Sequence, residues 1–271
     1  MKTSPKLIFI LTLLFSVAGF TLRFLGVLSG WAGVLLVAAF VLCMILLLRP
    51  LEQRASWQNI FSTAPMANIF MLTAALGLLI GNLFLLASKS SSVSVAVNAP
   101  QVIAIFNTVQ APLGLAAAAC VATFAITCLF GKKPSALLFM IASLYTVVRL
   151  ILQFQSWNTD PSVAVYCYQL LAAICTMLGI FQLAGFSFDK GKRRITLFWC
   201  LSAVFFCGIS VADTLANRNI GEIILNASLL LLMVGASWQL LFCKGAAPMP
   251  LPEEEISSED AEEIPSEETA E

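Results

Sequence analysis

The chain has 271 residues, of which 59% are hydrophobic and 11% charged, and its mean hydropathy is +0.92. Because a soluble domain carries about 25% charged residues, this composition excludes an ordinary soluble fold and predicts an integral membrane protein. The formal net charge of zero conceals an asymmetry, since ten of the fifteen acidic residues lie between Glu253 and Glu271 and the remainder of the chain is basic.

The residue types that most enzymes use are scarce. There is no histidine, which excludes Ser–His hydrolysis and His-ligated zinc or haem within this chain. The eight cysteines lie in or beside apolar runs without a CxxC pair, which favours small buried side chains over a disulfide framework or a metal site. No P-loop or dinucleotide fingerprint occurs. We therefore expect a protein that is not an enzyme, with no cofactor, no metal and no nucleic-acid partner.

Eight segments are long and apolar enough to cross a bilayer, which takes about 20 residues. They are residues 7–28, 31–48, 66–87, 111–130, 135–154, 163–186, 195–216 and 221–242. The first resembles a signal peptide, but its apolar run continues to Leu28, so an uncleaved span is favoured. The sequence thus predicts an all-α, eight-span bundle in residues 1–245, surrounded by lipid.

The loops between these spans differ in positive charge. With eight spans both termini lie on one side, and Lys89 and Arg218 are the only basic loop residues on the other. This bias predicts cytoplasmic termini. The absence of a eukaryotic targeting signal and of a large external region favours a bacterial inner membrane. The eleven basic residues on the predicted cytoplasmic side are Lys2, Lys6, Arg49, Arg54, Lys132, Lys133, Lys190, Lys192, Arg193, Arg194 and Lys244.

Three segments outside the spans are distinctive. Residues 55–65 mix apolar and polar side chains, which is typical of an interfacial segment. Within the loop 88–110, the apolar stretch Val102–Phe106 predicts either an exposed loop or a short half-helix before the fourth span. Residues 246–271 are rich in Pro, Glu and Ser, which predicts a disordered cytoplasmic tail.

Polar residues inside the spans provide the functional signal. Tyr145, Arg149 and Gln153 recur every four residues and form one stripe on a helix, and Arg23 lies near the end of the first span. A charge at the centre of a span costs about 2.5–3.5 kcal/mol, and less near the edge, where an arginine can reach the headgroups. Inward-facing positions are favoured over this snorkelling because other polar residues lie at similar depth: Asn82, Asp213, Glu222 and Asn226.

Two interpretations of this inward-facing set remain open. The first is a network of salt bridges and hydrogen bonds that holds the helices together. The second is an outward-facing cavity for an anionic or zwitterionic solute, because the arginine fork suits carboxylate and phosphate. In the second interpretation the solute contacts Arg23, Asn82, Tyr145, Arg149 and Gln153, while Asp213, Glu222 and Asn226 provide coupling or salt bridges.

The sequence therefore predicts a small-solute transporter or membrane binding subunit. The alternative is a sensor, accessory or scaffold protein that acts through its cytoplasmic loops and acidic tail. In that case the partner is a protein that binds the tail, or a second copy of the chain. The spacing of 126 residues between Arg23 and Arg149 also suggests a duplicated four-helix unit in parallel orientation.

Overall fold

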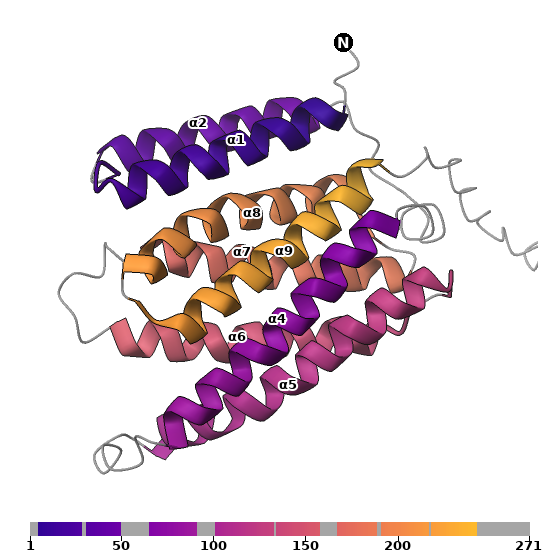
Figure 1. Cartoon of the computed structure of the whole chain (residues 1–271). Coiled ribbons are helices and arrows are strands. Elements are labelled where there is room, and N and C mark those ends of the chain that lie inside the picture. The colour runs from indigo at the N-terminus through magenta and orange to yellow at the C-terminus, as the bar shows by residue number, and fades with distance from the viewer. Residues whose placement is uncertain are drawn as a thin grey trace, which may run out of the picture.

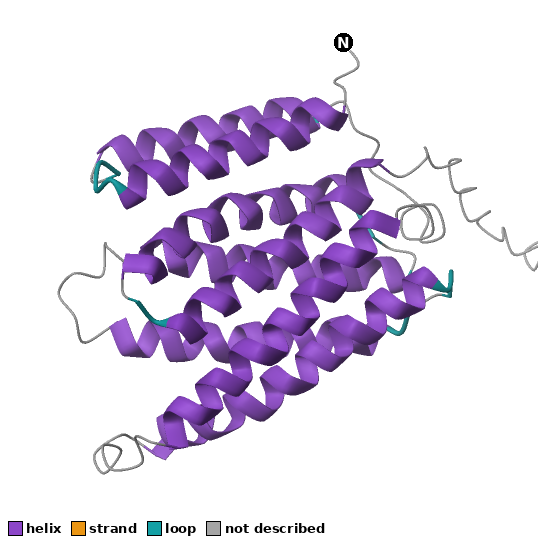
Figure 2. Ribbon diagram, viewed as in Figure 1, coloured by secondary structure: helices purple, strands orange, loops and turns teal. Residues whose placement is uncertain are grey.

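The computed structural model describes residues 5–28, 31–49, 65–90, 101–132, 134–157, 167–188, 191–216 and 218–242. Within these ranges all regular structure is helical (Figure 2). Eight helices are each long and apolar enough to cross a membrane, which confirms the predicted all-α, eight-span fold. They are α1 (Pro5–Phe24), α2 (Trp31–Leu48), α4 (Pro65–Ser90), α5 (Gln101–Leu129), α6 (Ala136–Trp157), α7 (Cys167–Ser187), α8 (Arg193–Ala216) and α9 (Ile220–Phe242).

Six of the helices form a closed ring. Each helix from α4 to α9 packs against the next in the chain, and α9 packs against α4 to close the ring. Figure 1 shows this ring from the side, with α9, α4 and α5 in front of α8, α7 and α6. Among the described helices, the interior of this ring is where side chains from six spans can meet away from lipid.

Helices α1 and α2 lie outside the ring. α1 packs along α8 and contacts α9, and α2 contacts α1 and α8 (Figure 1). α8 is covered by ring neighbours on both sides and by α1 and α2 on its outer face. It is therefore the most buried of the eight spans, with 78% of its apolar 18-residue window buried. Small residues allow this close approach, since a Cβ at Gly208 of α8 would overlap the Ser16 hydroxyl of α1.

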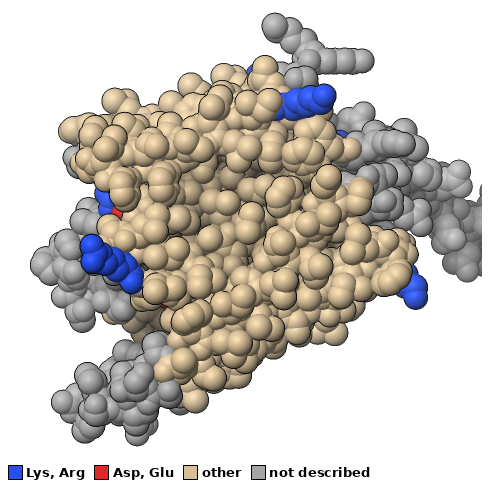
Figure 3. Space-filling view, viewed as in Figure 1, with Lys and Arg blue, Asp and Glu red and all other residues tan. Residues whose placement is uncertain are grey.

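The outer surface is apolar between two charged ends. In Figure 3 the Lys and Arg side chains lie at the two ends of the helices, and the broad face between them carries neither sign of charge. This distribution is what a bilayer requires of a surface that contacts its hydrocarbon core. We call the end at which α1 and α8 finish and α2 and α9 begin the distal end, and the opposite end the proximal end.

Most of the expected boundaries differ from the observed ones by a few residues, and two of the differences are informative. The first span ends at Phe24 rather than residue 28, because Gly26 takes a left-handed φ of 71° and the Leu28 amide turns back to the Leu22 carbonyl. Residues 102–106 are helical, as the half-helix alternative predicts. They are continuous with the fourth span in α5, which runs through Pro112 to Leu129, so neither a separate half-helix nor a loop is correct.

Some expectations fall outside the described residues. These are the interfacial segment 55–64, the central part of the long loop at 91–100, and the acidic tail 246–271. The side of the membrane on which the termini lie is likewise a prediction of the sequence.

The predicted internal repeat is matched in part by the helix pairs. α4 pairs with α5 as α8 pairs with α9, and α5 contacts α6 as α9 contacts α1. α7 packs extensively against α8, however, whereas the described parts of α2 and α4 have no comparable contact. Duplication therefore stays a prediction.

Candidate functional site

Arg149 lies inside the ring and is almost completely buried, with 2% of its surface exposed. Its Nη2 atom donates to Oε2 of Glu222 at 2.6 Å and to Oδ1 of Asn226 at 2.8 Å, both on α9. The polar stripe of Tyr145, Arg149 and Gln153 on α6 therefore faces the interior of the ring and not the lipid, since a lipid-facing arginine would extend to the headgroups. The two contacts connect α6 and α9 across the distal half of the ring.

The guanidinium of Arg149 has more donors than acceptors around it. Nε and Nη1 have no hydrogen-bond partner among the described residues, and neither has Nδ2 of Asn226. An arginine carries five N–H groups, and Nη2 supplies only two of them. Each buried donor left without an acceptor costs about 1–3 kcal/mol, so this cluster has an affinity for groups that accept hydrogen bonds.

A small cavity lies beside these donors. Its volume is about 10 Å³, close to the roughly 10–15 Å³ that holds one water molecule. It is lined by side chains from four helices of the ring: Thr146, Arg149 and Gln153 of α6, Gln169, Ala172, Ala173 and Thr176 of α7, Cys207 of α8, and Asn226 and Leu229 of α9. The arrangement can hold one compact group that accepts hydrogen bonds, such as one oxygen of an oxyanion.

Tyr145 and Asn82 extend the polar interior toward α4. The Tyr145 hydroxyl donates to Oδ1 of Asn82 at 3.2 Å, and the Asn82 Nδ2 donates to the Leu78 carbonyl at 2.8 Å. Both side chains are fully buried. Asn82 fits between α4 and α5 because residue 114 is glycine, where a Cβ would overlap the Asn82 amide. These contacts connect α4, α5 and α6. The sequence alone does not reveal them, because the residues lie far apart in the chain.

Glu222 lies in the first turn of α9, and local sequence explains its position. Asn219 precedes the helix and accepts a hydrogen bond from the Glu222 amide at 3.4 Å, as an N-cap residue does. An Asn-x-x-Glu sequence is typical of a capping box, but here the carboxylate contacts Arg149 instead. Its side chain is 22% exposed, against 3% for Arg149, so Glu222 lies between the buried guanidinium and the distal surface.

Arg23 forms a separate pair at the distal end. Its Nε atom donates to Oδ1 of Asp213 at 2.5 Å, and its Nη1 atom donates to the Leu28 carbonyl at 3.3 Å. The guanidinium also lies 5.4 Å from the ring centre of Tyr168, in cation–π range. The pair joins α1 to α8 outside the ring.

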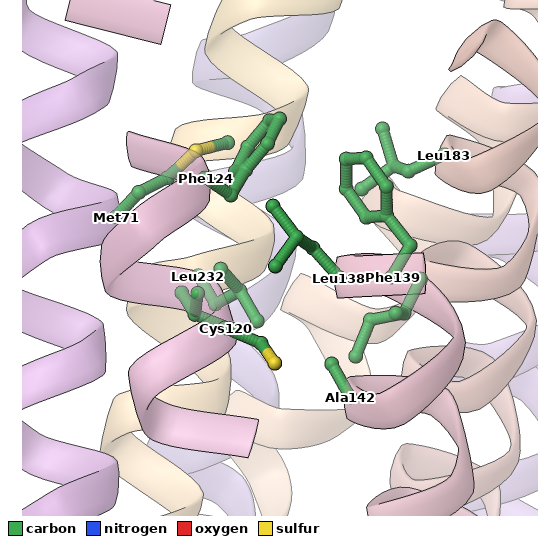
Figure 4. Close-up of a pocket in the computed structure, with 10 residues that line it drawn as sticks. Met71, Cys120, Phe124, Leu138, Phe139, Ala142, Leu183 and Leu232 are labelled. Atoms are coloured by element: carbon green, nitrogen blue, oxygen red, sulfur yellow. The ribbon is translucent and has the colours of Figure 1, made fainter. Parts of the chain in front are cut away.

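An apolar region of the ring interior lies on the proximal side of the Arg149 cavity. A cavity of about 20 Å³ there is lined by Met71, Cys120, Val121, Phe124, Leu138, Phe139, Ala142, Ile180, Leu183 and Leu232, and Figure 4 shows these side chains around it. Ala142 and Ile180 each lie four residues from Thr146 and Thr176 of the polar cavity, a separation of about 6 Å. Apolar packing therefore closes the polar site toward the proximal end.

Arg193, which the sequence analysis counts only as a basic loop residue, contacts the C-terminal end of α9. Its Nε atom donates to the Leu240 carbonyl at 2.8 Å, and its Nη2 atom donates to the Leu241 carbonyl at 3.5 Å. These carbonyls belong to the last turn of α9, where a helix has no internal donors left and its dipole favours a cation. Arg193 is thus both a basic residue at a span end and a cap for α9.

The structure brings the predicted site residues together in three groups. Arg23 and Asp213 form the distal pair, Asn82 and Tyr145 form a buried hydrogen-bonded pair, and the others line the Arg149 cavity or contact Arg149: Gln153, Glu222 and Asn226. Sequence analysis missed Gln169 and Thr176 on α7. Their spacing of seven residues, which places two polar side chains on one face of an apolar helix, is the signal that could have found them.

Comparison of the chain with protein-family models, with curated proteins and with solved structures finds no match in any of the three. The eight apolar helices define the class, which is a multi-pass α-helical membrane protein in contact with the lipid bilayer.

Proposed function

We propose that the protein binds a small anionic or zwitterionic solute at Arg149 and carries it across the membrane. The observation that supports this is the buried guanidinium, whose Nε and Nη1 atoms have no acceptor and adjoin a polar cavity inside the ring. Donors held away from water without an acceptor favour a group that accepts hydrogen bonds, because leaving them unsatisfied is costly. The solute passes unchanged, so no catalytic group is required.

Access to this site is through the distal end in the present conformation. Glu222 is partly exposed there, whereas the apolar layer around Phe124 and Phe139 closes the proximal side. The excess of basic residues at the other end predicts that the distal end faces outward. Transport then requires the apolar layer to open while the distal end closes, as in alternating access.

The proposal assigns Arg23 and Asp213 to the attachment of α1 rather than to the solute. Arg23 has a carboxylate, a backbone carbonyl and an aromatic ring as partners, and it lies outside the ring that contains the cavity. This separation supplies a matched control, because two arginines at the same end of the bundle are expected to respond differently to solute.

The test is a thermal-shift screen of the purified full chain in nanodiscs. The probes are the sodium salts of formate, acetate, lactate and phosphate, and the zwitterions glycine and alanine. A ligand at about 100 times its Kd stabilises a protein by about 2.7 kcal/mol, which raises the melting temperature by several degrees. We expect at least one probe to do so for the wild type and Arg23→Gln, and none for Arg149→Gln.

A second variant, Asn226→Asp, tests the site independently if Arg149→Gln does not fold. Asn226→Asp keeps an acceptor for Nη2 but removes the Nδ2 donor and adds a negative charge beside the cavity, so it should also abolish the shift. A water molecule in the cavity would satisfy the donors without any solute and predicts no shift with any probe. That result would refute the proposal.

Removal of residues 246–271 separates the proposal from the sensor or accessory alternative. Because these residues lie outside the ring helices, the solute-dependent shift should be unchanged in the truncated chain. A shift that disappears with the tail, while Arg149→Gln retains it, would favour the alternative.

A further inference from the structure

The charges around Arg149 are already balanced before any solute arrives. Nη2 contacts the Glu222 carboxylate, and the partly buried pair of Arg23 with Asp213 is balanced as well. An anion at Nε or Nη1 would therefore place two negative charges beside one guanidinium. Two like charges about 4 Å apart repel by about 4 kcal/mol even at an effective dielectric constant of 20, so an anion alone is poorly accommodated.

Among the described residues, no cation other than Arg149 contacts Glu222 or lines the cavity. Besides Glu222, the titratable or charged side chains near this pair are Tyr145 and Arg149 of α6 and Cys207 of α8, of which only Arg149 carries a charge at neutral pH. Asp213 of α8 contacts Arg23 of α1. α4, which packs closely on α9, contributes no charged side chain between Pro65 and Ala87, and α7 contributes none between Cys167 and Ser187. Compensation must come from Glu222 itself.

We propose that binding of the anionic solute at Arg149 is coupled to uptake of one proton by Glu222, which makes the protein a proton–anion symporter. The inference rests on the proposed function and names the coupling ion. The carboxylate oxygen Oε2 that accepts from Arg149 takes up the proton from water at the distal end, where its side chain is 22% exposed. The solute anion then replaces Glu222 as the counter-ion of the guanidinium, and the proton leaves with it.

Asn226 makes this exchange possible without loss of the helix contact. Its Oδ1 atom accepts from the same Nη2 atom that contacts Glu222, so α6 and α9 stay connected when the carboxylate is neutralised. Its Nδ2 atom has no acceptor and offers a further donor to the incoming anion. The charge of the site therefore changes, while the hydrogen bond between α6 and α9 is retained.

The experiment is isothermal titration calorimetry of the full chain in nanodiscs with sodium formate. Formate is chosen because the cavity accepts only a compact group. Titration at one pH in two buffers with different ionisation enthalpies gives the number of protons taken up. We expect about one proton per formate, and an apparent Kd that rises about tenfold per pH unit above neutral pH, as linkage of one proton requires.

Glu222→Gln resembles the protonated state and supplies the decisive variant. We expect it to bind formate without proton uptake and with an affinity that no longer depends on pH. Asp213→Asn is the matched control, since it removes a carboxylate from the other pair and should retain both proton uptake and pH dependence. Formate binding without protons, or proton uptake that persists in Glu222→Gln, would overturn the coupling and leave the proposed function standing. No binding of formate at any pH would overturn the coupling as stated, and together with no thermal shift for any other probe it would overturn the proposed function as well.

Discussion

Arg23 and Arg149 come from similar apolar sequence but lie in different surroundings. Arg23 sits between α1 and α8, where Asp213, the Leu28 carbonyl and the Tyr168 ring surround its guanidinium. Arg149 sits inside the closed ring, with Nη2 paired and with Nε and Nη1 lacking acceptors. The difference shows that the presence of an arginine in a span does not by itself indicate a binding site. Buried N–H groups without acceptors, as in Arg149, are the informative feature.

Substitution of Arg149 is expected to have the largest effect on stability and on anion binding. Arg149→Leu leaves Asn226 and Glu222 without their donor, and breaking a buried pair costs about 3–5 kcal/mol. Replacing both partners, as Arg149→Leu with Glu222→Leu, should restore most of this stability but no anion binding. Unfolding in a denaturing detergent and the thermal-shift screen measure the two effects. A double variant that still binds solute would remove Arg149 from the site.

The distal pair should behave in the opposite way. Arg23→Leu or Asp213→Leu alone should cost about 1–3 kcal/mol, because each leaves a partly buried charge unpaired. The double variant should recover stability and also retain the solute-dependent shift. Loss of that shift in the stable double variant would show that the two arginines are not distinct in role.

Gly114 gives a smaller effect with a specific origin. In Gly114→Ala the added Cβ overlaps the Asn82 amide, so the Tyr145–Asn82 hydrogen bond must shift, at a cost of about 1–3 kcal/mol. Gly185→Ala is the control, because its Cβ would meet only the Gly191 backbone at ordinary contact distance. Alanine there gains up to about 1 kcal/mol in helix propensity. Equal destabilisation of both variants would contradict this account of Asn82.

The smallest effect is expected at Arg193, away from both pairs. Arg193→Gln weakens the hydrogen bonds to the Leu240 and Leu241 carbonyls and removes the positive charge at the end of α9, which should cost about 1–2 kcal/mol. Arg194→Gln is matched in charge and position but should change the unfolding free energy by less than about 0.5 kcal/mol. A similar loss in both would indicate that loop charge, not the cap, accounts for the effect.

The number of spans and the depth of their polar residues could be predicted, because hydropathy and a rise of about 1.5 Å per residue determine both. The stripe of Tyr145, Arg149 and Gln153 could be predicted from the helical period. The partners could not. Asp213 and Glu222 lie at similar depth, and only the order of helices around the ring determines which arginine each one meets. That order depends on packing between spans, which no single segment encodes.

Closure of the ring by α9 against α4 has a consequence for biosynthesis. Arg149 enters the bilayer with α6, whereas Glu222 and Asn226 follow it by 73 and 77 residues in the last span. The nascent protein therefore contains a charged span whose counter-charge has not yet been made, and the penalty on insertion scales is about 2.5–3.5 kcal/mol at the helix centre. Chains interrupted before α9 would lack the counter-charge of Arg149 and are expected to insert α6 less stably.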